Sequence, residues 1–135
     1  MSQHLGKPLH VGISVRSMDR SLAWYERVLG FRMVKDDGWL PPLEARVCFV
    51  EKDGFQLELF EYRQPLPIPE GRLTPNTDLQ TIGTKHVAFQ VTDMEGMKAH
   101  LTAHGVDIAH EVRMGGDWVL FIRDPDGVLI ELIQK

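Results

Sequence analysis

An internal repeat constrains the fold of this chain more than any other feature. The stretch "HVGISVRSMDRSLAWYERVLGF" begins at His10, and the similar stretch "HVAFQVTDMEGMKAHLTAHGV" begins at His86. A second pair lies downstream, where "EKDGFQLELFE" (51–61) aligns with "DPDGVLIELIQ" (124–134). Because similar segments form similar local structure, the chain of 135 residues contains two copies of one supersecondary unit of about sixty residues.

Each copy opens with a strand-like alternation that leads into a helix. In residues 9–15 the apolar side chains share one face and His10 lies on the other, as in a half-buried strand. Ser17 or Asp19 can cap the helix that follows, and Gly30 ends it. The apolar stripe of this helix is Met18, Leu22, Tyr25 and Leu29.

Three short strands complete each copy, and turns rich in Asp and Gly join the last two of them. In the first copy we predict strands near residues 31–35, 45–50 and 56–61. In the second copy we predict a strand at 85–91, a helix at 94–104, and strands near 107–112, 118–123 and 128–134. This order predicts one α+β domain over residues 1–135, with modules at about 8–61 and 85–134 and a proline-rich linker at 62–84.

Composition excludes several classes of partner. The net charge is −4 and the 15 Lys and Arg are scattered, which is not typical of a nucleic-acid surface. No apolar run approaches the ~20 residues that a membrane span needs. The single cysteine, Cys48, cannot form an internal disulfide, and "MSQHLGKP" has no signal-peptide pattern, so we expect a cytoplasmic protein. The expected partner is a small molecule.

One carboxylate lies among aliphatic residues at the same place in each copy. Glu131 interrupts "GVLIELIQ", and Glu58 occupies the matching position. Alternation places both on the strand face that does not pack against the helices, the face that also carries His10 and His86. A buried carboxylate needs a partner. Two imidazoles and two carboxylates would form a five- or six-coordinate site for Zn²⁺, Ni²⁺, Co²⁺, Mn²⁺ or Fe²⁺.

These motifs resemble the vicinal oxygen chelate superfamily, the group of glyoxalase I, methylmalonyl-CoA epimerase, extradiol dioxygenases and antibiotic-resistance proteins. The opening stretch from His10 and the closing "FIRDPDGVLIELIQ" carry the resemblance, which extends from about Leu9 to Gln134. It implies two tandem βαβββ modules that form a cupped mixed sheet around a metal. By position, the ligands that it implies are His10, Glu58, His86 and Glu131.

The implied ligand set is most similar to that of glyoxalase I. Extradiol dioxygenases typically use two histidines and one glutamate, whereas glyoxalase I has a further glutamate at the position of Glu58. The resemblance therefore implies a metal-dependent lyase or isomerase that acts through a metal-stabilised enediolate on a small oxygen-chelating substrate. It implies Glu131 as the base and Glu58 as a second ligand or opposing acid/base. The alternatives are an Fe²⁺-dependent extradiol-type dioxygenase and a resistance or binding protein.

Other positions bear on the substrate and on assembly. Ser14 stands where glyoxalase I usually has an arginine, and Tyr62 stands where it usually has an asparagine. Trp39, Arg113 and Trp118 lie in two loop-like stretches and are candidates for the pocket mouth, for loop anchors or for a dimer contact. We expect a homodimer, whose sites close within one chain or are shared between exchanged modules.

Overall fold

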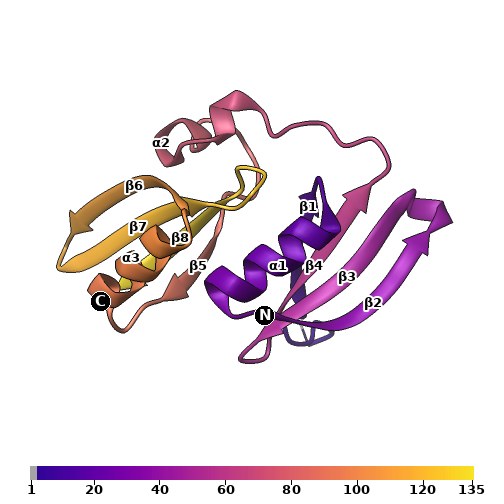
Figure 1. The fold of residues 1–135 in the computed structure, drawn as a ribbon, viewed down its shortest axis with the longest axis horizontal. Helices are drawn as coiled ribbons and strands as arrows, with labels where there is room; N and C mark the ends of the chain where they lie inside the picture. The colour runs from indigo at the N-terminus through magenta and orange to yellow at the C-terminus, as the bar shows by residue number, and fades with distance from the viewer. Residues whose placement is uncertain (1–2) are drawn as a thin grey trace. The chain divides into compact units, whose positions relative to one another are not determined.

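The computed structural model describes residues 3–135 and contains two compact units, with their boundary between Pro65 and Leu66 (Figure 1). Each unit contains one mixed four-stranded sheet and one long helix. The predicted α+β fold of two tandem modules is confirmed. The boundary lies inside the predicted linker of residues 62–84, so most of that segment belongs to the second unit.

The first unit has the order β1-β4-β3-β2 in its sheet. The pair β1–β4, at one edge of the sheet, is parallel, and the other two pairs are antiparallel. A 3₁₀ helix, η1 (Pro41–Leu43), joins the second and third strands. The elements are β1 (His10–Val15), α1 (Met18–Leu29), β2 (Arg32–Leu40), β3 (Ala45–Lys52) and β4 (Phe55–Tyr62).

The second unit repeats this topology, with the order β5-β8-β7-β6. Here too the pair of first and last strands is parallel and the others are antiparallel. Two short helices, η2 (Glu70–Arg72) and α2 (Pro75–Asp78), precede the repeat itself. The repeat consists of β5 (Val87–Gln90), α3 (Met94–Ala103), β6 (Asp107–Met114), β7 (Asp117–Arg123) and β8 (Leu129–Gln134). None of the helices in residues 3–135 is long and apolar enough to span a bilayer.

Helix α1 begins and ends where the sequence predicts. The amide of Arg20 donates to the Ser17 side chain over 3.3 Å, so Ser17 is the N-cap. Gly30 ends the helix with a φ of 78°, a left-handed conformation that glycine adopts without a steric penalty. The amide of Met18 donates to Glu61 at the end of β4, which fixes the start of the helix against its own sheet.

The aliphatic face of the last strand in each unit forms the core. Leu57 and Leu59 in the first unit, and Ile130 and Leu132 in the second, are at most 2% exposed. Burying each such side chain stabilises the fold by about 1.5–3 kcal/mol. This burial fixes which sheet face packs inward, so the alternate residues of β4 and β8, including Glu58 and Glu131, lie on the opposite face.

Strand β2 is longer than the sequence predicts. We expected it to end near residue 35, but it continues to Leu40, so Trp39 lies in a strand and not in a loop. Two register shifts, between Met33 and Lys35 and between Asp36 and Gly38, keep β2 paired with β3 through a segment that has few strand-forming residues. Such bulges accommodate an extra residue without ending the strand.

Candidate functional site

In the first unit, a histidine and a glutamate meet on the sheet face opposite the core. The Nε2 atom of His10 lies 3.1 Å from Oε1 of Glu58, and the side chains are 33% and 21% exposed. They come from neighbouring parallel strands, because His10 pairs with Gln56 and Glu58 is two residues further along β4. Phe49 lies opposite Glu58 on β3, and its ring stands edge-on to the imidazole with centroids 5.3 Å apart.

The second unit contains the same arrangement. The Nε2 atom of His86 lies 3.2 Å from Oε1 of Glu131, with side chains 25% and 18% exposed. Phe121 lies opposite Glu131 on β7, and its ring is edge-on to His86 at a centroid distance of 5.0 Å. The sequence repeat therefore corresponds to a repeat of side-chain geometry.

A further residue extends each arrangement to the outer strand. Lys35 of β2 lies opposite Phe49, with its Nζ 5.8 Å from the ring centroid, and His110 of β6 lies opposite Phe121. Sequence reasoning missed all four of these residues. Alternation along a strand says which residues share a face, but the pairing of strands decides which of them stand side by side.

The distances within the pairs are those of a hydrogen-bonded imidazole and carboxylate, and they also allow both atoms to bind one ion. Ligand nitrogens and oxygens lie about 2.1 Å from a transition metal, so two such atoms at right angles around one ion are about 3.0 Å apart. The measured separations of 3.1 and 3.2 Å match this value. Each unit supplies one imidazole and one carboxylate, and no group of three or more His, Cys, Asp or Glu that could hold a metal occurs among residues 3–135.

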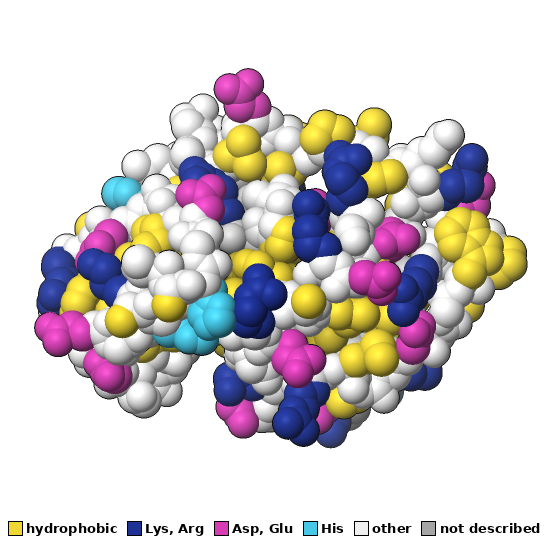
Figure 2. All heavy atoms as spheres, viewed as in Figure 1, with side chains coloured by type: hydrophobic (Ala, Val, Ile, Leu, Met, Phe, Trp, Pro, Cys, Tyr) yellow, Lys and Arg dark blue, Asp and Glu magenta, His cyan; other side chains and the backbone are white. Residues whose placement is uncertain are grey.

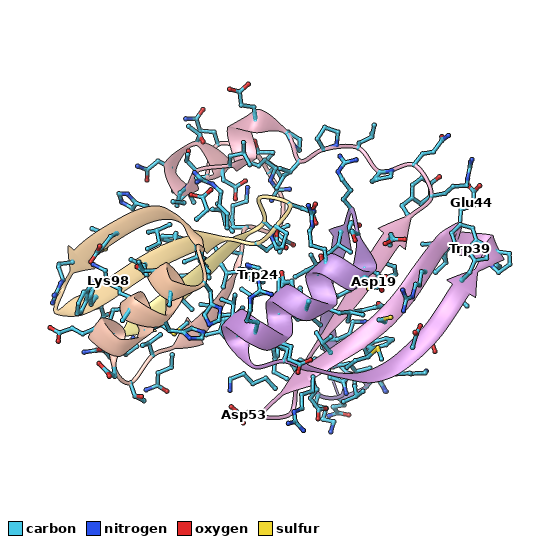
Figure 3. All side chains as sticks on the ribbon, viewed as in Figure 1. Asp19, Trp24, Trp39, Glu44, Asp53 and Lys98 are labelled. Atoms are coloured by element: carbon cyan, nitrogen blue, oxygen red, sulfur yellow. The ribbon has the colours of Figure 1, made fainter. Side chains whose placement is uncertain are left out.

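Trp39 lies on the other face of the first sheet. It pairs with Arg46 across β2 and β3, and Arg46 donates to Asp19 of α1 over 3.1 Å. Because directly opposite residues share a face, Trp39 is on the helix side. Its side chain is 50% exposed, and Figure 3 shows it near Glu44 at the end of the β2–β3 hairpin.

Arg113 and Trp118 also lie on the helix side of their sheet. They pair across β6 and β7, and the guanidinium carbon lies 3.8 Å from the indole centroid. Trp118 Nε1 donates to Glu111 over 2.7 Å, and Lys98 of α3 (Figure 3) donates to the same carboxylate over 2.9 Å. These contacts tie the hairpin to the helix, on the face opposite His86 and Glu131.

The strongest electrostatic perturbations also lie on the helix side. A hydrogen bond from Arg46 holds the pKa of Asp36 down at about 2. Burial raises the pKa of the Cys48 thiol to about 11, and its hydrogen bond with Asp36 adds to this. On the face drawn in Figure 2, basic and acidic side chains are interspersed.

The comparisons with known protein sequences agree on one family. The pattern of the Glyoxalase/Bleomycin resistance protein/Dioxygenase superfamily matches residues 7–132. Glyoxylase I 4 of Arabidopsis thaliana is 30% identical over 98% of this chain and 76% of its own length. Lactoylglutathione lyase of Haemophilus influenzae is 29% identical over 94% of this chain and 91% of its own length. Lactoylglutathione lyase GLX1 of Arabidopsis thaliana is 28% identical over 94% of this chain, which spans only 44% of that protein.

The fold has counterparts among solved structures. The glyoxalase family protein from Enterococcus faecalis superposes with a TM-score of 0.79 at 23% identity, over 94% of this chain and 96% of the other. At this level of identity the likeness concerns the fold. Together with the family match over nearly the whole chain, it leads to one conclusion: the chain belongs to the glyoxalase/bleomycin resistance protein/dioxygenase superfamily.

Proposed function

We propose that this protein is a glyoxalase-type lyase that depends on a divalent metal bound by His10, Glu58, His86 and Glu131. The observation that carries the proposal is the repeated contact between a histidine Nε2 and a glutamate Oε1, at 3.1 Å in one unit and 3.2 Å in the other. Relatives named lactoylglutathione lyase, at 28–29% identity, support the reaction class.

One pair from each unit completes the proposed ligand set. A divalent ion held there supplies a Lewis acid for the two neighbouring oxygens of a chelating substrate. Phe49 and Phe121 support the imidazoles edge-on and present apolar surface beside each pair. This surface limits the water around His10 and His86 and strengthens electrostatic interactions in the site.

The carboxylates carry the proton transfer in this proposal. Glu131 takes a proton from the carbon next to the substrate carbonyl, and the electron pair of the broken C–H bond forms an enediolate of the substrate. Glu131 then returns the proton to the adjacent carbon while the hydroxyl proton of the substrate passes to the neighbouring oxygen, so the substrate is isomerised without gain or loss of atoms. Glu58, on the matching strand of the other unit, acts as the second ligand or as the opposing acid/base.

The substrate is proposed only as a small molecule with two adjacent oxygens, such as the hemithioacetal of a 2-oxoaldehyde. Two positions bear on which thiol the protein accepts. Ser14 shares the face of His10 on β1 but carries no charge that would bind a carboxylate. The hydroxyl of Tyr62 donates to Glu44 over 3.3 Å and is engaged within its own unit.

The test combines metal analysis with turnover. Protein purified without oxygen is stripped of metal, reloaded with Zn²⁺, Ni²⁺, Co²⁺ or Fe²⁺, and assayed with hemithioacetals of methylglyoxal and several thiols. We expect thioester formation with at least one of the first three ions and none in the stripped protein. Turnover that needs Fe²⁺ and consumes O₂ would indicate the dioxygenase alternative. Equal activity with and without metal would refute the proposal.

A further inference from the structure

His86 lies just outside the strand that follows it. Strand β5 begins at Val87, whereas β1 in the first unit begins at His10 itself. The backbone before His86 belongs to residues 68–85, which we call the strap. The strap contains η2 and α2, and its internal contacts fix the course of the chain into His86.

Asp78 is the centre of the strap. Its side chain is 2% exposed, and it accepts a hydrogen bond from Nε of Arg72 over 2.7 Å. The Nζ atom of Lys85 lies 3.3 Å from the same carboxylate oxygen and donates to the backbone carbonyls of Asp78 and Thr81. Arg72 also donates to the carbonyl of Thr84. Both residues that directly precede His86, Thr84 and Lys85, are therefore tied to this cluster.

The strap is also fixed to the strand connection that leads to Glu131. Arg123, at the end of β7, donates from Nε to the carbonyl of Leu73 over 2.7 Å. Gly127 lies directly beneath the side chains of Leu73 and Ile68, because a Cβ at that position would come within 2.6 Å of Leu73 Cδ2. The strap thus contacts the approach to β8 as well as the approach to His86.

We propose that Asp78 is a positioning residue, which holds His86 in the orientation that ligates metal. The proposal rests on the proposed function, in which His86 is a ligand. Asp78 touches neither His86 nor Glu131 in the structure and acts through the backbone. An ionised carboxylate can accept strong hydrogen bonds from both Arg72 and Lys85, whereas an amide in its place leaves two cationic side chains without their anion. Residues that hydrogen-bond a ligand directly typically contribute 10- to 100-fold to metal affinity, and we expect about 10-fold from Asp78, which acts one step further from the ligand.

The experiment compares Asp78→Asn with two controls in the same unit. Glu111→Gln removes a carboxylate that binds a lysine, Lys98, on the opposite sheet face. Leu101→Ala lowers stability by truncating a helix side chain that is 0% exposed and outside the strap. For each protein we measure the affinity for Zn²⁺ by calorimetry, the melting temperature, and, without metal, the NMR linewidth of the His86 imidazole and hydrogen exchange at the amides of residues 87–89.

We expect Asp78→Asn to weaken Zn²⁺ binding by about 10-fold, to broaden the His86 resonance and to speed exchange at residues 87–89. Both controls should bind Zn²⁺ within about twofold of the unchanged protein, since neither residue lies in the strap or bonds to Asp78. If Asp78→Asn does not fold, Lys85→Met removes one partner and leaves Arg72 on the carboxylate, and it should shift the same readouts in the same direction.

Two results would overturn the inference. One is unchanged affinity and an unchanged His86 resonance in folded Asp78→Asn. The other is an equal loss of affinity in Leu101→Ala, which would make the effect one of stability alone. If the unchanged protein binds no metal, the proposed function fails by itself, and the metal-free readouts at His86 and residues 87–89 still decide whether Asp78 positions this segment.

Discussion

His10 and Glu58, which lie 48 positions apart in the sequence, come together with Nε2 and Oε1 at 3.1 Å. The parallel pairing of β1 with β4 causes this contact, since it places a residue of β4 two positions beyond the partner of His10 on the same face. The same offset in the second unit brings His86 to Glu131. Duplication of one module thus gives two donor pairs of closely similar geometry.

Loss of one imidazole should weaken metal binding strongly. His86→Ala removes a neutral ligand and leaves Glu131 without the imidazole that contacts it. We expect the affinity for Zn²⁺, Ni²⁺ and Co²⁺ to fall by more than about 100-fold, because ligands contribute more than the residues that orient them. Titration calorimetry measures this, and His104→Ala, at an exposed position at the end of α3, is the matched control. Unchanged affinity for all three ions would remove His86 from the site.

Glu131→Gln should separate metal binding from proton transfer. The amide keeps an oxygen at the position of the carboxylate but cannot accept the proton from carbon. We expect turnover and incorporation of solvent deuterium to fall by about 10²- to 10⁴-fold, the usual contribution of a general base, while some metal remains bound. Metal content is measured on the same samples. Normal deuterium exchange in this variant would show that Glu131 is not the base and would assign that role to Glu58 or another residue.

Asp36 should contribute to stability in a defined pH range. A hydrogen bond from Arg46 lowers its pKa to about 2 in the folded protein, while an unfolded Asp titrates near 3.9. Since the folded pKa is depressed, this stabilisation is present above about pH 4 and is lost as the pH falls towards 2. The free energy of unfolding, measured with urea between pH 2 and 6, should therefore fall less steeply on acidification in Asp36→Asn than in the unchanged protein. Asp53→Asn, at a side chain that is 88% exposed, is the control and should follow the unchanged protein.

A mixing experiment tests how the modules assemble. We propose that the protein is a homodimer. In the experiment, His10→Ala chains and His86→Ala chains are co-expressed, and the mixed dimer is isolated. If modules are exchanged between chains, one site collects both lesions and the other is intact, so about half the metal binds. If each chain closes its own site, both sites are damaged and neither binds well. A monomer at micromolar concentration in sedimentation would contradict the dimer.

The sequence by itself determined the repeat and the order of elements within it. Period-two alternation identified the faces of β1, β4 and β8, and the caps Ser17 and Gly30 marked the ends of α1. These signals are local, because a strand face or a helix end depends on residues close together in the chain. The recurrence of histidine and glutamate on the outward face was enough to nominate His10, Glu58, His86 and Glu131 before any contact was visible.

Only the tertiary structure decided which side chains stand together. Lys35 and Trp39 are four residues apart on β2, so simple alternation places them on one face. The register shift between Asp36 and Gly38 moves Trp39 to the helix side while Lys35 stays beside Phe49. Likewise, the buried Asp78 in the strap has no periodic signal, since its partners Arg72 and Lys85 are brought to it by turns. Register, bulges and buried ion pairs depend on contacts between segments, and no local pattern in the sequence contains them.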